Sequence, residues 1–198
     1  MRVSIVCGSQ RSGQSAFLMN YLKEVCINAE ISEVNTINLF ERKIKFWDEE
    51  VWSKGKDWDT NWNAISEELS NSQGIIILAP EYGGMVPPIL KNFFLLCSQN
   101  ELAHKPALLV GVSSGINGAY PIMELRGSSY KNNKICFMPD HLIIREVEDF
   151  ISNPESEKFI RINERIKYSI NMLKIYTEAF NQIRSNAEVF LPKFKYGM

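Results

Sequence analysis

The sequence lacks long hydrophobic runs and an excess of charge of either sign. No apolar run approaches the roughly 20 residues of a membrane-spanning helix. The first residues, up to Cys7, are apolar only briefly before Gly8-Ser9, so a signal peptide is not expected. With 22 Lys and Arg against 23 Asp and Glu, the formal net charge is −1. This near-neutrality argues against nucleic acid as the main partner and, less strongly, against a strongly acidic electron-carrier surface.

Paired cysteine motifs are also missing. Cys7, Cys26, Cys97 and Cys136 are scattered without a Cys-x-x-Cys pair, and three of them lie in apolar runs. Buried free thiols in a reducing compartment are therefore favoured over metal ligands or a redox pair. We expect no metal site, no membrane partner and a cytoplasmic location.

What the sequence does contain is an alternation of strand and helix patterns along 198 residues, enough for one well-packed domain. Strands are expected over Val3–Cys7, Val34–Leu39, Gly74–Ala79, Ala107–Val112 and Leu142–Arg145; helices over residues 14–28, 62–70, 88–98, 120–130 and 155–184, the last as one helix or two. This order predicts an α/β fold, a doubly wound five-stranded parallel sheet with helices on both faces. Ligands of such sheets bind beyond the carboxyl ends of the strands, where the strand order reverses.

The loop after the first strand, Gly8 to Ser15, favours phosphate binding. It leads into a helix N-terminus, whose amides and dipole attract anions. The hydroxyls of Ser9, Ser12 and Ser15 and the charge of Arg11 add donors. The loop matches neither Gly-x-Gly-x-x-Gly nor the Gly-Lys-Ser/Thr of a P-loop. Taken alone, it is equally compatible with an ordinary capped turn.

Two further loops follow buried strands. In Pro80 to Pro88, the pair Gly83-Gly84 allows positive φ angles and exposed amides at the edge of a flat heteroaromatic ring, with Tyr82 as a stacking wall. The segment Ser113 to Gly118 is small and polar. Simple chain reversal and a helix N-terminal turn are the respective alternatives, but three such loops at one sheet edge together favour a site.

These segments resemble the NADPH-dependent FMN reductases, a family with relatives that act on quinones, azo dyes and chromate. The resemblance lies in Gly8-Ser9-Gln10-Arg11, in Pro80-Glu81-Tyr82-Gly83-Gly84 followed by Pro87 to Asn92, and in Ser113 to Gly118 followed by Leu125-Arg126. It covers about residues 2–145 in order, and the middle motif is the specific one.

The resemblance implies a flavodoxin-like three-layer α/β/α sandwich that binds FMN, with NADPH or NADH as electron donor and a small-molecule acceptor. The implied phosphate-binding residues are Ser9, Arg11, Ser12, Gly13, Gln14 and Ser15. The implied ring-binding residues are Pro80, Glu81, Tyr82, Gly83, Gly84, Ser113 and Gly115. It also implies a homodimer or homotetramer with the helix after Pro88 in the interface, although core packing explains the apolar Phe93, Phe94 and Leu95 equally well.

Three departures from the family pattern stand out. Gly83 replaces the usual Asn, and Ser15 matches the family's second serine only if one residue of the loop is skipped. The part after Asn153 exceeds the family core, so residues 153–198 are expected to form a C-terminal helical extension and tail of a single domain, 1–198.

No catalytic acid or base is nominated, since the flavin ring carries the hydride chemistry. Glu81 is expected to be a structural carboxylate, and His104 and His141 to lie in loops or on the surface. The tryptophan-rich segment 41–62 either packs beneath a long connection or forms a rim over a neighbouring subunit's flavin. Two alternatives to an NAD(P)H-dependent reductase stay open: an FMN electron-carrier or interaction module without nicotinamide turnover, and a relative that has lost FMN.

Overall fold

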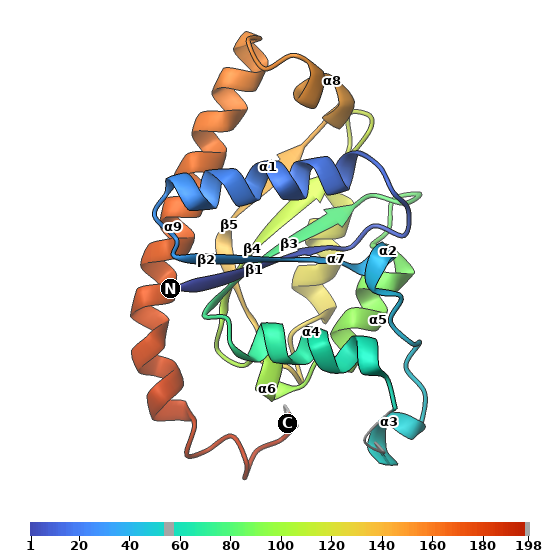
Figure 1. Ribbon diagram of the computed structural model, residues 1–198, viewed down its shortest axis with the longest axis vertical. Coiled ribbons are helices and arrows are strands. Elements are labelled where there is room, and N and C mark those ends of the chain that lie inside the picture. Colours follow the sequence, from blue (N-terminus) through green and yellow to red (C-terminus); the bar gives the residue numbers. More distant parts are fainter. Residues whose placement is uncertain (54–57, 197–198) are drawn as a thin grey trace.

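The structure is a computed structural model that describes residues 1–53 and 58–196, and one parallel sheet organises it (Figure 1). In chain order the elements are β1 (Arg2–Cys7), α1 (Gln14–Asn28), β2 (Glu33–Asn38), α2 (Leu39–Arg42), α3 (Glu50–Ser53), α4 (Thr60–Ser70), β3 (Gly74–Pro80), α5 (Pro88–Leu96), α6 (Gln99–Leu102), β4 (Pro106–Val112), α7 (Tyr120–Ser128), β5 (Cys136–Ile144), α8 (Val147–Ser152) and α9 (Glu157–Ala187). The five strands pair in the order β2-β1-β3-β4-β5, and every pair is parallel.

Helices cover both faces of this sheet. One apolar cluster joins α1, α8 and α9 to one face, and a second joins α4, α5, α6 and α7 to the other. The strand order and the two helical layers are those of the flavodoxin-like fold. The expected three-layer α/β/α sandwich is confirmed.

The central strands form where continuous apolar runs predict them. All residues of β3 and of β4 are buried, because helices cover both faces of the sheet at these positions. The second strand is shifted by one residue from its expected range. It ends at Asn38, whose side chain accepts a hydrogen bond from the Phe40 amide and so starts the short helix α2 at Leu39.

The expectation for the fifth strand was wrong at its start. The strand begins at Cys136 rather than at Leu142, because Pro139 interrupts the apolar pattern. β5 is an edge strand, where proline is tolerated, and its pairing with β4 shifts register between Ala107 and Leu109. The guanidinium of Arg126 donates to the carbonyls of Met138 and Pro139 and secures the irregular stretch.

The closing helix is one helix, α9, which starts after Ser156, whose hydroxyl accepts a hydrogen bond from the Phe159 amide. The expected apolar stripe packs on the sheet: Ile166, Ile170 and Leu173 are buried, and Phe159, Ile162 and Tyr176 are partly buried against the same cluster. Within residues 1–53 and 58–196, no helix combines the length and apolar character needed to cross a bilayer. The single-turn helices α2, α3 and α6 and the short α8 were not predicted, since so few residues show no periodicity.

The tryptophan-rich segment divides between core and surface; its residues 54–57 lie outside the described residues. Trp62 is buried, and Trp58 packs partly buried against the same cluster. Trp47 and Trp52 are exposed and meet edge to face, with ring centroids 5.4 Å apart. The side chain of Asn92, on α5, accepts from the Trp47 amide at 2.7 Å and so holds this segment against that helix.

Candidate functional site

The strand order reverses between β1 and β3, so the loops that follow these strands leave the same edge of the sheet in opposite directions. Together with the loop after β4 they enclose a cleft of about 70 Å³. Its lining includes many of the residues that the sequence nominates: Ser9, Arg11, Gly13, Gln14, Ser15, Pro80, Glu81 and Tyr82. Ser12, Gly83, Gly84, Ser113 and Gly115 lie in the same loops but outside this lining.

The first loop presents the start of α1 to the cleft. The helix begins at Gln14 after Gly13, a residue with no side chain to cap the first amides. Those amides and the helix dipole favour an anion at this point. Arg11 lines the cleft and is exposed, whereas Ser15 is nearly buried. The geometry therefore suits a phosphate group.

Ser9 is engaged inside the loop rather than free to donate. Its hydroxyl donates to the Arg11 carbonyl at 2.8 Å and accepts from the Arg11 amide at 3.2 Å. Before it, Gly8 allows a close approach of β1 to α5: a Cβ there would lie 2.6 Å from Leu90 Cδ2. Ser9 thus shapes the loop, and Gly8 fixes its position against α5.

The second loop is a two-residue hairpin. The Tyr82 amide donates to the Met85 carbonyl at 3.0 Å, and the Met85 amide donates to the Tyr82 carbonyl at 3.1 Å. Gly83 and Gly84 have φ angles of 58° and 77°, the two positive values of a type I′ turn. Asn and Gly are both favoured at such positions. Gly83 therefore keeps the backbone conformation that Asn in the family motif would adopt.

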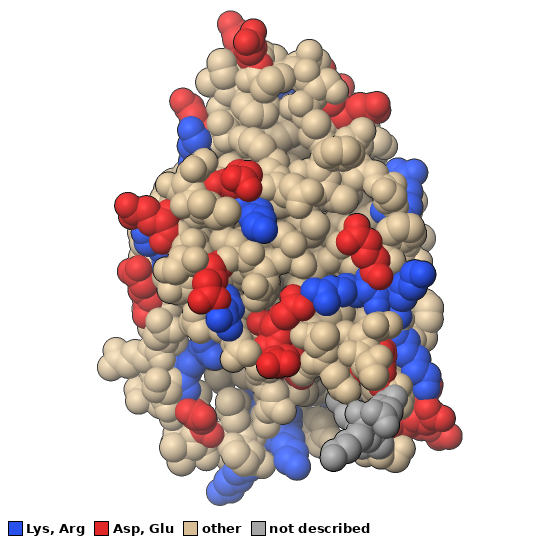
Figure 2. All heavy atoms as spheres, in the orientation of Figure 1, with Lys and Arg blue, Asp and Glu red and all other residues tan. Residues whose placement is uncertain are grey.

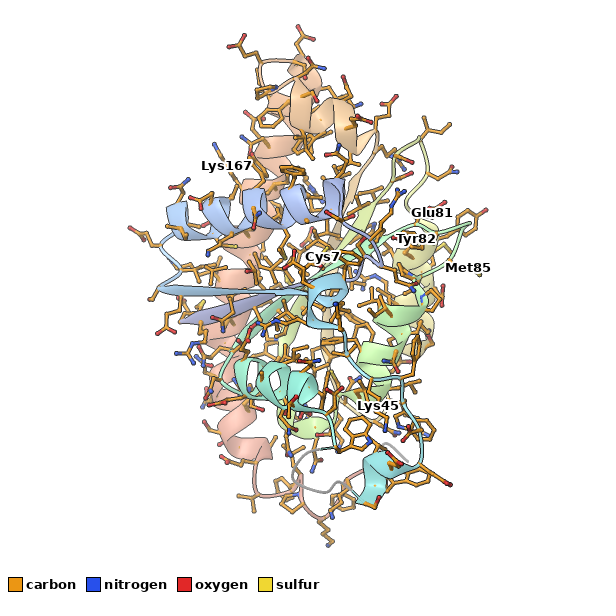
Figure 3. All side chains as sticks on the ribbon, turned by 45° about the vertical axis from the view of Figure 1, so that its right-hand side comes forward. Cys7, Lys45, Glu81, Tyr82, Met85 and Lys167 are labelled. Carbon is orange, nitrogen blue, oxygen red and sulfur yellow. The ribbon has the colours of Figure 1, made fainter. Side chains whose placement is uncertain are left out.

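Tyr82 connects the first two loops. Its hydroxyl lies 3.2 Å from the Ser9 hydroxyl and accepts from the Gln10 amide at 3.2 Å. Figure 3 shows Glu81, Tyr82 and Met85 together on the loop that follows β3. In this conformation the Tyr82 side chain reaches the first loop and lines one side of the cleft.

Glu81 connects the second loop to the third. Its amide donates to the Val112 carbonyl at 2.8 Å, and its carboxylate accepts from the Gly118 amide at 2.5 Å. These bonds support the expected structural role. The third loop in turn is bonded to the start of α8, since the Ser113 carbonyl accepts from the Val147 amide and the Gly115 carbonyl from the Glu146 amide.

The match to known proteins agrees with this geometry. The family model for NADPH-dependent FMN reductase matches residues 1–149. The chain belongs to this family. A 2-hydroxy-1,4-benzoquinone reductase from a Burkholderia species is 27% identical over 110 residues, which are 51% of this chain. The chain spans 56% of that relative's length.

Solved structures of related fold are similar over most of the chain. FerB from Paracoccus denitrificans, a flavoenzyme NAD(P)H:(acceptor) oxidoreductase, matches with a TM-score of 0.73 at 18% identity over 90% of this chain and 98% of its own. An oxidoreductase from Corynebacterium diphtheriae matches with a TM-score of 0.68 at 16% identity over 90% and 97%. At these identities the structural matches show the fold alone. The family match ends at residue 149, before α9 (Glu157–Ala187), so the whole of that helix lies outside the matched residues.

Sequence reasoning missed three residues of the cleft in this family member: Val112, Ser114 and Val147. Ser114 lies between two nominated residues and is exposed, whereas Ser113 accepts from the Gly115 amide at 3.1 Å and faces its own turn. Val147 follows β5. All strands of a parallel sheet end at one edge, so the loop after the fifth strand could also have been nominated.

No cysteine is among the described residues that line the cleft. Cys7 ends β1 directly before the first loop, and burial raises the pKa of its thiol to about 11. The thiol is therefore protonated at neutral pH and unreactive. In the described part of the chain, no cluster of His, Cys, Asp and Glu side chains could hold a metal ion.

The residues fit the phosphate end of FMN. The enclosed volume of about 70 Å³ is about twice the roughly 30 Å³ share of one water molecule. It is far below the roughly 300–1,000 Å³ of pockets that enclose a whole ligand. A phosphate group therefore suits the enclosed part, and a flavin ring would have to lie in the open region between the hairpin at Gly83-Gly84 and the third loop.

Proposed function

We propose that this protein binds FMN at the cleft and uses it to transfer a hydride from NADPH or NADH to a small acceptor. The observation that carries the proposal is the meeting of the α1 N-terminus, Arg11 and the type I′ hairpin at the reversal of strand order. A helix N-terminus and an arginine bind the phosphate, while exposed hairpin amides border a flat ring. Family membership supports the same cofactor.

In this proposal the protein binds and orients, while bound FMN supplies the hydride chemistry. Arg11, Ser15 and the first amides of α1 hold the phosphate, with Ser12, Gly13 and Gln14 in the same loop. Pro80, Tyr82 and the Gly83-Gly84 turn border one side of the ring, and Ser113 to Gly115 border the other. Glu81 fixes the spacing between these two sides through the Gly118 amide.

The surface around this region favours a flat, apolar acceptor. Met85 is 60% exposed, Tyr120 61% and Met123 70%. The Val86 amide donates to the Glu124 carboxylate at 2.8 Å, which ties the hairpin to α7 one residue after Met123. Tyr120 and Met123 are three residues apart on that helix and so share a face. Such a rim suits a quinone, a free flavin or an azo compound better than a metal oxyanion, and one relative is a benzoquinone reductase.

We also propose that the protein is a homodimer or homotetramer that uses α5. Phe93 and Phe94 are buried in the core, so they do not serve an interface, but Leu95 on the same helix is 63% exposed. The exposed Trp47 and Trp52 extend the apolar surface beside α5. Sedimentation velocity of the wild type and of Leu95→Lys tests this, with a shift toward monomer expected for the variant.

The function is tested by titrating the purified protein with FMN and then adding NADPH, or NADH, without oxygen. We expect bound flavin to lose its absorbance in one two-electron step and to regain it when 1,4-benzoquinone is added. Bound flavin that neither nucleotide reduces would favour the carrier alternative. A protein that binds no FMN would contradict both functions.

A further inference from the structure

A second and larger cleft lies at the opposite end of the sheet. Its volume is about 630 Å³, within the roughly 300–1,000 Å³ usual for small-molecule sites. It is lined by the last residue of α4, by α6, by His104 and Lys105 just before β4, and by the last turns of α9. In Figure 1 these elements meet at the lower end of the molecule, far from the loops that follow β1 and β3. We call it the amino-end cleft.

Lys105 brings a buried positive charge to its wall. The side chain is only 1% exposed. Its ammonium donates to the carbonyls of Leu69 at 2.5 Å and Ser70 at 3.2 Å, at the C-terminal end of α4. Carbonyls and the helix dipole offset this charge only in part, and among the described residues Lys105 forms no salt bridge with a carboxylate.

Arg184 lines the same cleft from α9 and is half-buried. Within residues 1–53 and 58–196 its guanidinium has neither a hydrogen bond nor a salt bridge, although Glu188 lies one turn further along the helix. The imidazole of His104 likewise has no hydrogen-bond partner in the described part of the chain. A half-buried guanidinium without partners is costly, since its donors are neither bonded nor fully hydrated.

The basic groups of the cleft also repel one another. Burial lowers the pKa of His104, and the positive charges of Lys134 and Arg184 lower it further. Burial and Arg184 together bring the pKa of Lys105 to about 7. Burial is the largest cause of both shifts, and the attraction of Glu101 offsets the shift of Lys105 only in part. An anion bound in the cleft would attract the positive charges of His104, Lys105 and Arg184 and so reduce their mutual repulsion.

The acidic residues nearby supply only part of the counter-charge: Glu101 attracts Lys105 and Glu188 attracts Arg184, but neither forms a salt bridge with them among the described residues. The buried carboxylate of Glu101 accepts hydrogen bonds from the Ser98 amide, the Ser98 hydroxyl and the Ser66 hydroxyl, at donor–acceptor distances of 2.6 to 2.7 Å. Glu188 is exposed and lines the rim. Figure 2 shows Lys and Arg side chains around the hollowed lower end of this face.

We propose that the amino-end cleft binds a small organic anion through a carboxylate or phosphate group, with the Arg184 guanidinium as its main contact. The planar guanidinium donates two parallel hydrogen bonds to either group. Gln99 and Ser185 add polar partners, and Leu191 and Pro192 form an apolar wall for the carbon skeleton. The site is independent of the proposed flavin cleft, which lies at the other end of the strands.

The test is isothermal titration of the protein with citrate and, separately, with pyrophosphate, with one equivalent of FMN present throughout to occupy the flavin cleft without excess FMN phosphate in solution. We expect one-to-one binding of at least one of the two anions, and the anion that binds identifies the group as carboxylate or phosphate. Arg184→Gln should weaken this binding at least tenfold. Arg161→Gln, which removes one exposed arginine from the same helix, should leave it unchanged.

Three outcomes would overturn the proposal. They are the failure of both anions to bind at millimolar concentration, unchanged affinity in Arg184→Gln, and equal weakening in both variants. Equal weakening would mean that net charge alone attracts the anion. Thermal unfolding of each variant checks that the fold is retained, and because Arg184 has no partner to lose among the described residues, the Arg184→Gln protein should fold normally.

Discussion

The hydroxyl of Tyr82 lies 3.2 Å from the hydroxyl of Ser9, although 73 positions separate the two residues. The same tyrosine hydroxyl accepts from the Gln10 amide. The hairpin after β3 is thereby joined to the loop after β1, across the point where the strand order reverses. The Gln10 amide that Tyr82 engages could also donate to a phosphate.

Tyr82→Phe is expected to speed the binding of FMN. The substitution keeps the ring but removes the hydroxyl, so the Gln10 amide no longer has to give up its bond to Tyr82 before it can donate to the phosphate. One neutral hydrogen bond contributes about 0.5–1.5 kcal/mol, which corresponds to a gain of up to about tenfold in the association rate. Stopped-flow measurement of flavin fluorescence gives the rate. A slower association in Tyr82→Phe would mean that the tyrosine instead prepares the loop for the ligand.

Arg11→Ala combined with Ser15→Ala should weaken FMN binding without unfolding the protein. Arg11 is exposed, and both residues line the cleft at the start of α1. One hydrogen bond to a charged group contributes about 1.5–3 kcal/mol, so the loss of one contact should lower affinity by roughly tenfold to a hundredfold, and the loss of both by more. Fluorescence titration with FMN measures this, and riboflavin, which lacks the phosphate, should bind wild type and variant alike. Equal FMN affinity in both proteins would contradict the assignment of the phosphate to this loop.

The hairpin glycines should respond differently to substitution. Gly83→Asn, which restores the family residue, should change the free energy of unfolding by less than about 0.5 kcal/mol, because Asn tolerates φ near 58°. Gly84→Ala should cost about 1–2 kcal/mol, because a Cβ is strained at φ of 77° although open space surrounds it. Urea unfolding measures both. Equal costs would contradict the type I′ assignment.

The order of the elements was predictable because β3 and β4 are unbroken apolar runs and α9 carries a long apolar stripe. Both patterns arise because buried positions are occupied by apolar residues, and the spacing of apolar residues can be read from the sequence. The start of β5 was not predictable, because Pro139 looks like a strand break. Only the structure shows that it lies on an edge strand and that Arg126 binds the carbonyls around it.

The candidate site was predictable by loop but not by side chain. Tyr82 and Glu81 were nominated as ligand contacts, yet Tyr82 bonds to the first loop at Ser9 and Gln10, and Glu81 bonds to the third loop at Gly118. Such contacts join residues far apart in sequence, and periodicity carries no information about them. Arg184 and Lys105 were not nominated for the same reason, since the cleft that they share forms only when α9 returns past the start of β4.

Lys105 should make the stability of the protein depend on pH. Its pKa falls from 10.5 to about 7 in the folded protein, chiefly through burial. Between these values the unfolded chain binds a proton that the folded protein lacks, so stability rises with pH over this range. Below about pH 7 both states are protonated, and the folded state carries the full cost of the buried charge.

Lys105→Met removes this titration. The variant should therefore show a smaller rise in the free energy of unfolding from pH 7 to pH 10 than the wild type does. Loss of the bonds to Leu69 and Ser70 shifts the variant's stability without changing the slope. Urea unfolding at several pH values gives both slopes, with Lys131→Met, an exposed lysine, as the matched control. Parallel profiles for wild type and Lys105→Met would mean that the α4 carbonyls keep Lys105 charged throughout, and its pKa would then lie near the ordinary lysine value.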